Sequence, residues 1–188
     1  MPYAQFATSW SPDGETLAFN YEHPETKFDI YLLELRDEAR PFLRTEFNES
    51  AAMFSPDGRW LAYQSDESGR NEVYVRPFPG PGEKRQVSRE GGSEPLWAPG
   101  GGELFYRNPN GTFAVAMETN PELKLGEPAL LYNLDLAIPA GLNIPSYDVA
   151  PDGQRFLAIR ESDDELSRIE ITVVLNWFQE LERLVPTN

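Results

Sequence analysis

The sequence contains no cysteine among its 188 residues. That absence excludes disulfide bonds, thiolate metal sites and a cysteine nucleophile, and it leaves the redox compartment undetermined. The sequence also lacks any run of about 18 apolar residues, and residues 1–4 show neither the basic nor the apolar segment of a signal peptide. We therefore expect no insertion into a membrane, and export would need a segment that this sequence lacks.

Positive charge is scarce as well, because 16 Lys and Arg residues stand against 31 Asp and Glu and give a net charge of −15. A surface of this charge repels phosphate backbones and anionic lipid head groups, so we expect no nucleic-acid partner. Hydrophobic residues at 40% and charged residues at 25% are the proportions of a folded globular protein. The 17 prolines and 14 glycines favour many short strands over long helices.

A five-residue motif recurs four times along the chain, at residues 10–14, 54–58, 97–101 and 149–153. Its first two copies read Trp-Ser-Pro-Asp-Gly and Phe-Ser-Pro-Asp-Gly, and the intervals between copies are 44, 43 and 52 residues. Proline presets φ, aspartate accepts a hydrogen bond from the backbone, and glycine tolerates the left-handed conformation. The motif therefore predicts a hairpin turn, not a catalytic loop.

Short runs of strand-forming residues surround each motif. The runs directly after the motif are residues 16–21, 60–64, 103–107 and 155–160. A third run follows at 29–35, 72–76, 112–116 and 169–175, and a fourth at 41–44, 85–88 and 129–132. Four strands in a unit that repeats at this interval are typical of a β-propeller. We predict an all-β, partial or half propeller in one domain, 1–188, with blades at about 3–45, 48–90, 92–133 and 144–176.

The fourth unit shows only three strands, because residues 169–175 lead directly into a helical pattern. Asn176 is a suitable N-cap with Gln179 three residues on, and Pro186 stops the run. We predict a helix over 177–185 whose apolar face packs on the rim of the propeller or binds a partner. The candidate interface residues are Trp177, Phe178, Leu181 and Leu184.

A four-bladed arc leaves strand edges and apolar flanks uncovered, and such surfaces pair with something. Two copies related by a two-fold axis could cover each other's open ends. We therefore predict a homodimer in which the first blade of one chain meets the fourth blade of the other. The alternative is that this sequence belongs to a longer propeller of six to eight blades whose other blades fill the gap.

The Ser-Pro-Asp-Gly turns followed by Leu-Ala-Phe or Leu-Ala-Tyr resemble the repeats of TolB-type, or WD40-like, propellers. More narrowly, residues 63–79, 92–97 and 174–178 resemble the propeller at the C-terminal end of many bacterial serine/threonine protein kinases. The resemblance implies a sensor domain without kinase activity, since no kinase motif is present, and it suggests an extracytoplasmic location. The sequence departs from the repeat at Gly100, where aspartate is expected.

No residue pattern here indicates catalysis or metal binding. His23 is the only histidine and is expected to be an exposed loop residue, not a base or a ligand. Residues 66–72 carry oxygen ligands around a glycine but lack the ligand order of a calcium loop, so we expect a plain turn. The acidic run 163–165 is expected to be a solvated hairpin tip. We assign no catalytic residue, no metal site and no cofactor.

These observations lead to two functional hypotheses. The first is a non-catalytic module, not an enzyme, that recognises a protein, a peptide or a small polar ligand through loops on one propeller face. The second is a hydrolase or lyase that uses carboxylates and a cation in the central channel. Fold alone does not decide between them, because one architecture supports many chemistries.

Overall fold

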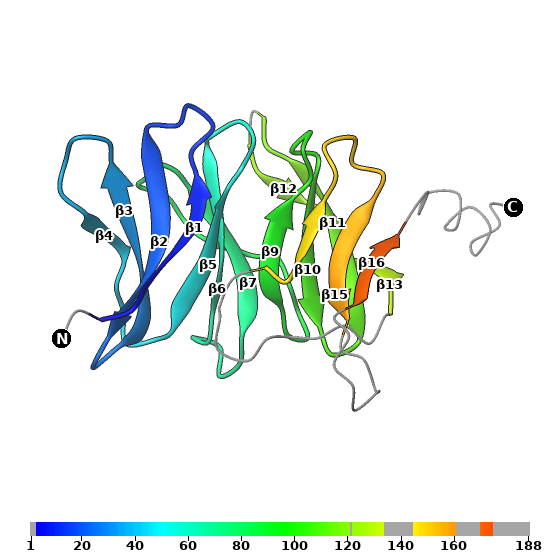
Figure 1. Cartoon of the computed structure of the whole chain (residues 1–188), viewed down its shortest axis with the longest axis horizontal. Helices are drawn as coiled ribbons and strands as arrows, with labels where there is room; N and C mark the ends of the chain where they lie inside the picture. The colour runs from blue at the N-terminus through cyan, green and yellow to red at the C-terminus, as the bar shows by residue number, and fades with distance from the viewer. Residues whose placement is uncertain (1–2, 121, 134–144, 161–169, 175–188) are drawn as a thin grey trace, which may run out of the picture.

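The computed structural model describes residues 3–120, 122–133, 145–160 and 170–174. These residues form antiparallel β-sheets that stand side by side in a row, as Figure 1 shows, and none of them is helical. We number the sheets as blades 1 to 4 from the N-terminal side. The described part of the chain therefore has no helix that could cross a membrane.

Blades 1 and 2 each contain four strands in sequential order. Blade 1 comprises β1 (Gln5–Trp10), β2 (Thr16–His23), β3 (Lys27–Glu34) and β4 (Arg40–Leu43). Blade 2 comprises β5 (Glu49–Phe54), β6 (Trp60–Ser65), β7 (Glu72–Pro77) and β8 (Arg85–Gln86). The predicted all-β partial propeller is confirmed in these sheets.

Blades 3 and 4 depart from the four-stranded pattern. Blade 3 comprises β9 (Ser93–Trp97), β10 (Glu103–Asn108), β11 (Gly111–Glu118), β12 (Lys124–Leu125) and β13 (Ala129–Tyr132), of which β12 and β13 both pair with β11. Blade 4 comprises β14 (Tyr147–Val149), β15 (Phe156–Arg160) and β16 (Glu170–Val174). The short strand β12 was not predicted, whereas the described part of blade 4 has three strands as expected.

Two predictions lie outside the described residues. They are the helix 177–185 with its four interface candidates and the acidic hairpin tip 163–165.

The four motif turns share one backbone geometry. The N–H of Gly14 donates to the carbonyl of Ser11 at 2.8 Å, and the same bond recurs at the other three motifs. In the first motif the carboxylate of Asp13 also accepts from the hydroxyl of Ser11 and from the N–H of Glu15. Gly101 keeps the turn, with φ of 70°, although Gly100 replaces the aspartate. The departure at Gly100 therefore removes a side-chain acceptor but not the turn.

The hydrophobic core lies between blades. We call the packed contact between two neighbouring blades a seam. In the first seam, Ala18 and Leu32 of blade 1 pack with Leu61 and Tyr63 of blade 2. Further clusters join blade 2 to blade 3 and blade 3 to blade 4. We call the side of a blade that faces the following blade its trailing face, and the side that faces the preceding blade its leading face. A blade buries its apolar residues only with a neighbour on each side.

The two ends of the blades differ in their loops (Figure 1). The end with the four motif turns, at the top of Figure 1, is called the turn end. The opposite end is called the connector end, because the chain passes there from blade 1 to blade 2 and from blade 2 to blade 3. It also holds the β2–β3, β6–β7 and β10–β11 hairpins.

Candidate functional site

Four buried carboxylates gather at the connector end. Asp29, Glu49, Glu72 and Glu94 belong to β3, β5, β7 and β9. Each lies within the first three residues of its strand, which is why all four reach the same end of the blades. Burying a carboxylate is costly unless protein groups replace its water, so each of these acids shapes the loops around it.

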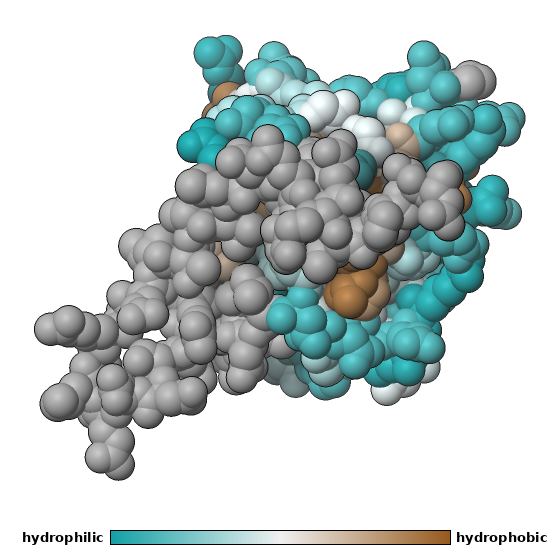
Figure 2. Space-filling model, turned by 90° about the vertical axis from the view of Figure 1, so that its right-hand side faces the viewer, coloured by the Kyte–Doolittle hydropathy of each residue, from teal (hydrophilic) through white to brown (hydrophobic). Residues whose placement is uncertain are grey.

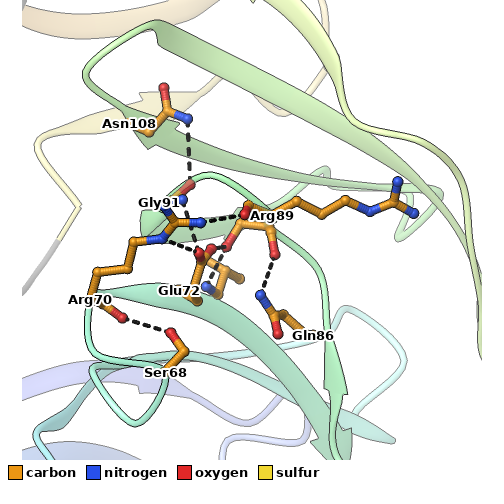
Figure 3. A network of polar contacts seen from close by, with 9 residues as sticks. Ser68, Arg70, Glu72, Gln86, Arg89, Gly91 and Asn108 are labelled. Carbon is orange, nitrogen blue, oxygen red and sulfur yellow. Dashed lines mark hydrogen bonds and ion pairs between the residues drawn. The ribbon is translucent and has the colours of Figure 1, made fainter.

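Glu72 holds the connection between blades 2 and 3, as Figure 3 shows. One carboxylate oxygen accepts from Arg70 Nε at 2.7 Å and from the N–H of Gly91 at 3.0 Å. The other oxygen accepts from the hydroxyl of Ser88, which in turn accepts from the N–H of Val73 at 2.7 Å. Glu72 therefore has donors on both oxygens.

The chain passes very close to itself at this connection. A Cβ placed on Gly92 would lie 2.5 Å from the hydroxyl oxygen of Ser88, so only glycine fits there without a shift. Arg70 also donates to the carbonyl of Arg89, and Asn108 donates to the carbonyl of Gly91 at 3.4 Å (Figure 3). The β6–β7 hairpin, the β10–β11 hairpin and the connection are thus fixed relative to one another.

The first strands of blades 2 and 3, β5 and β9, each contain a β-bulge. A side chain of the preceding blade accepts a hydrogen bond from each bulge. Ala51 and Glu94 adopt left-handed φ values of 55° and 56° in these bulges, a conformation that is unfavourable for residues other than glycine. The N–H of Ala51 donates to the amide oxygen of Asn20 at 3.1 Å, and that of Glu94 donates to Gln64 at 3.0 Å. These amides therefore stabilise the bulges across the first and second seams.

The third seam, between blades 3 and 4, is held by charged side chains. The position of Asn20 and Gln64 is occupied by Arg107, whose guanidinium has no acceptor to offer. Instead, one oxygen of Glu94 accepts from the N–H of Ser146 at 2.8 Å and from its hydroxyl at 2.7 Å. Arg107 Nη1 lies 3.4 Å from the same oxygen. Glu94 therefore ties blade 3 to blade 4.

Tyr147 completes this cluster. Its hydroxyl donates to the carbonyl of Glu94 at 2.9 Å, and its ring lies 6.0 Å from the guanidinium of Arg107. Burial, together with the nearby Glu94 carboxylate, raises the pKa of Tyr147 well above its usual value. The tyrosine is therefore a neutral donor at every ordinary pH.

Asp29 and Glu49, in the first seam, are less well satisfied. One oxygen of Asp29 accepts from the hydroxyl of Thr26 at 2.9 Å, and one oxygen of Glu49 accepts from the hydroxyl of Thr45. The second oxygen of each carboxylate is buried with no hydrogen-bond donor among the described residues. Burial raises the pKa of both carboxyls, and the charge of Asp29 raises that of Glu49 further.

His23 and residues 66–72, which were assigned no functional role from the sequence, lie at this end. His23 is the last residue of β2 and not part of a loop, because the hairpin ladder continues to the pair His23 and Lys27. Its Nε2 lies 3.0 Å from Arg44 Nη2. In the 66–72 segment, the N–H of Gly69 donates to the carbonyl of Asp66, and the Asp66 carboxylate accepts from the N–H of Asn48. The segment is therefore built as a turn whose acids hold neighbouring loops.

Among the residues that the structure describes, no three acidic or histidine side chains are grouped so that they could hold a metal ion. Asp29, Glu49 and Glu94 were not singled out from the sequence, because each is a lone acid near the start of a strand, and Glu72 was considered only as part of the 66–72 segment. One signal was available in the repeat. Asn20, Gln64 and Arg107 all stand seven residues after the fourth residue of their motif, where a buried strand is expected to be apolar.

Comparisons with known proteins agree with this architecture. A family model described as the TolB beta propeller domain matches residues 1–130. The structure of TolB from Acinetobacter baumannii is 16% identical, with a TM-score of 0.68 over 93% of this chain and 41% of that protein. A putative TolB from Agrobacterium tumefaciens is 20% identical, with a TM-score of 0.63 over 80% of this chain and 56% of that protein.

An oligogalacturonate lyase in complex with manganese has the same fold, with 16% identity and a TM-score of 0.58 over 93% of this chain and 48% of the lyase. The chain thus spans about half the length of these three proteins. At such identities the likeness concerns the fold alone.

Proposed function

Because the chain belongs to the TolB beta propeller domain family, we propose that it is a non-catalytic recognition module. Its ligand is a protein, a peptide or a small polar molecule, and the loops of the connector end bind it. Family membership supports a binding module in general terms. Loops held on a rigid sheet scaffold are a common location of such sites.

The observation that carries this proposal is that the carboxylates of Glu72 and Glu94 form their hydrogen bonds with donors of the protein itself. Both are buried, and both accept from backbone and side-chain donors of the protein itself. A carboxylate used in acid or base catalysis must instead reach the substrate. These acids therefore support a scaffold that presents loops, which suits recognition better than turnover.

Because residues 63–79 resemble kinase-associated propellers, we propose that the recognition module acts as a sensor. In that case the connector end would detect an external ligand, and a separate part of the parent protein would respond. The mixed charges of the loops, with Arg89 paired to Glu127 and Lys27 paired to Asp66, favour a polar partner.

The binding proposal can be tested by selecting phage-displayed random peptides on the immobilised chain and measuring the affinity of the selected peptides. We expect Arg89→Glu, at the connector end, to reduce binding at least about tenfold. Arg155→Glu is the matched control, because Arg155 is also an exposed arginine in an ion pair but lies at the turn end. Equal binding by both variants would place the site elsewhere.

The alternative is a hydrolase or lyase that uses carboxylates and a cation. It is supported by the fold of the manganese-bound lyase and by the oxygens of Asp29 and Glu49 that have no hydrogen-bond donor among the described residues. A screen of hydrolase and lyase substrates, with and without calcium or manganese, tests it directly. Turnover that Glu49→Gln abolishes would replace the recognition proposal.

We also propose that the chain forms a homodimer. In the described structure, blade 1 has no neighbour on its leading face and blade 4 has none on its trailing face. Additional blades of a longer propeller would cover the same two faces, and this remains the competing proposal.

A further inference from the structure

The leading face of blade 1 carries the residues that form seams elsewhere in the molecule. Trp10 pairs with Leu17 in the same register as Phe54 with Leu61 and Trp97 with Leu104. Phe54 and Trp97 are 7% and 5% exposed because the preceding blade covers them, whereas Trp10 is 53% exposed. Trp10 therefore occupies a position that a preceding blade covers in blades 2 and 3, but no described residue covers it here.

Two leucines on this face repeat the pattern. Leu35, which is 60% exposed, corresponds to Phe78, because their N–H groups donate to equivalent carbonyls at Glu15 and Arg59. The ring of Phe78 lies 6.1 Å from that of Phe42 in the preceding blade. Leu33 stands opposite Leu17, as Arg76 stands opposite Leu61, and Arg76 stacks on Phe42.

Aromatic rings fill the middle of the same face. Phe19 and Tyr31 lie 5.8 Å apart, which is also the separation of the corresponding rings of Tyr63 and Tyr74 in the first seam. Tyr21 extends the row at 4.9 Å from Tyr31. Phe19 is 7% exposed and Tyr21 and Tyr31 are half-buried, so Trp10, Leu33 and Leu35 are the large apolar side chains that this face leaves exposed.

The motif turns give a second, independent sign. Pro12 lies 3.5 Å from the Cβ position of Gly58, and Pro56 lies 3.7 Å from that of Gly101, so the proline of one blade contacts the turn of the next. No described residue lies within 4 Å of the corresponding position at Gly14 or at Gly153. The contact therefore occurs at two of the three seams, and the first turn has room for the same contact.

Blade 4 presents the complementary side. Leu157 occupies the position of Ala18 and Ala62, which form the trailing faces of blades 1 and 2, and it is 45% exposed. A hollow of about 240 Å³ lies beside it, lined by Asp148, Pro151 and Arg155 and by Val149 and Phe156, which belong to the cluster between blades 3 and 4. Figure 2, which views the molecule from the blade-4 end, shows a small hydrophobic patch with hydrophilic residues on one side of it.

We propose that the leading face of blade 1 docks on the trailing face of blade 4 of a second copy of this chain, with Trp10 against Leu157 and Pro151 against Gly14. Because both halves of the seam occur in one chain, a two-fold axis forms the contact twice and closes the ring. The ring would contain eight blades, within the usual four to eight of β-propellers. This inference rests on the proposed homodimer and names the surfaces that form it.

The test is light scattering on the purified chain and on variants at micromolar concentration. The leading-face variant combines Leu33→Lys with Leu35→Lys, and the trailing-face variant is Leu157→Lys. Lysine lowers the negative net charge, so added repulsion cannot explain a loss of association. The matched control is Leu130→Lys, because Leu130 is a leucine of similar exposure on the outer strand β13.

We expect the wild type and the control to have twice the mass of the chain, and each face variant to dissociate with about a hundredfold weaker association. A mixture of the two face variants should form mixed dimers, since each variant supplies the face that the other has lost. Mixed dimers would also show that both variants are folded.

Three results would overturn the inference. A dimer that neither face variant weakens would leave the homodimer but reject these surfaces. Dissociation of the leading-face variant without rescue in the mixture would mean that two leading faces pair with each other. A wild-type monomer would reject the homodimer itself, and the two faces would then await further propeller blades. None of these results bears on recognition at the connector end.

Discussion

The turn end and the connector end belong to the same four blades but are held in different ways. At the turn end, one short backbone hydrogen bond recurs at all four motifs, whether or not aspartate is present. At the connector end each seam has its own donors and acceptors, with Asp29 and Glu49 in the first, Glu72 in the second and Glu94 in the third. The repeated end closes each hairpin in the same way, and the divergent end is where a recognition surface can be specific.

The largest effect is expected from Glu72→Ala at the connector end. The substitution leaves Gly91 N–H, Ser88 and Arg70 without their buried acceptor, and we expect it to lower the free energy of unfolding by about 3 kcal/mol. Urea denaturation measures the loss. Glu127→Ala is the control, because Glu127 belongs to an exposed ion pair and should contribute less than about 1 kcal/mol. Equal effects of the two variants would contradict the role assigned to Glu72.

A substitution of Glu49, in the first seam, should increase the free energy of unfolding instead of lowering it. The pKa of Glu49 is raised in the folded state by burial, so its contribution to stability is present at low pH and is lost as pH rises through the folded pKa. Glu49→Gln removes that loss and should stabilise the protein by about 1 kcal/mol at neutral pH. In urea denaturation between pH 4 and 8, the gain should shrink as the pH falls. A gain that does not depend on pH would refute this explanation.

Asp57→Ala tests the turn end. Burial raises the pKa of Asp57, but hydrogen bonds from Ser55 and Arg59 lower it more, so that the pKa lies below its usual value. The aspartate therefore stabilises the protein above its unfolded pKa, and this contribution is lost as pH falls. We expect a loss of about 1 kcal/mol at neutral pH and, by the same denaturation measurement, a smaller loss in acid.

Gly58→Ala probes the same turn through its backbone. Gly58 has φ of 70°, which alanine adopts only with strain, and about 1 kcal/mol of stability should be lost. Peptide binding should not change in either turn variant, because the turn end is remote from the proposed recognition loops. Full stability together with lost binding would show that the turn end is functional.

The smallest effect concerns the motif that lacks aspartate. Gly100→Asp supplies the missing acceptor, and nothing lies within 4 Å of the new Cβ. We expect a gain of about 0.5 kcal/mol in thermal denaturation. Gly102→Asp is the control, since nothing lies within 4 Å of its Cβ position either, yet it stands outside the aspartate position of the motif. A gain from both variants would mean that the effect arises in the unfolded chain.

The sequence by itself determined the repeat, the turns and the order of the strands. These features depend on local chemistry, since the motif residues Ser11, Asp13 and Gly14 interact with one another and with the next two residues. The same local signals gave the third turn without its aspartate. The same signals predicted the outer strands less accurately. The predicted strand 85–88 is limited to β8 (Arg85–Gln86), because Val87 and Ser88 turn inward to Val73 and Glu72.

The connector end was decided only by the tertiary structure. Glu72 meets Gly91 and Ser88 from 16 to 19 residues away, and Glu94 meets Ser146 across 52 residues. No spacing rule relates these residues, because they meet only after the blades have packed face to face. A lone acid at the start of a strand reads as a surface residue in the sequence. Its burial follows from the neighbouring blade, and the donors it receives follow from the connection that passes over it.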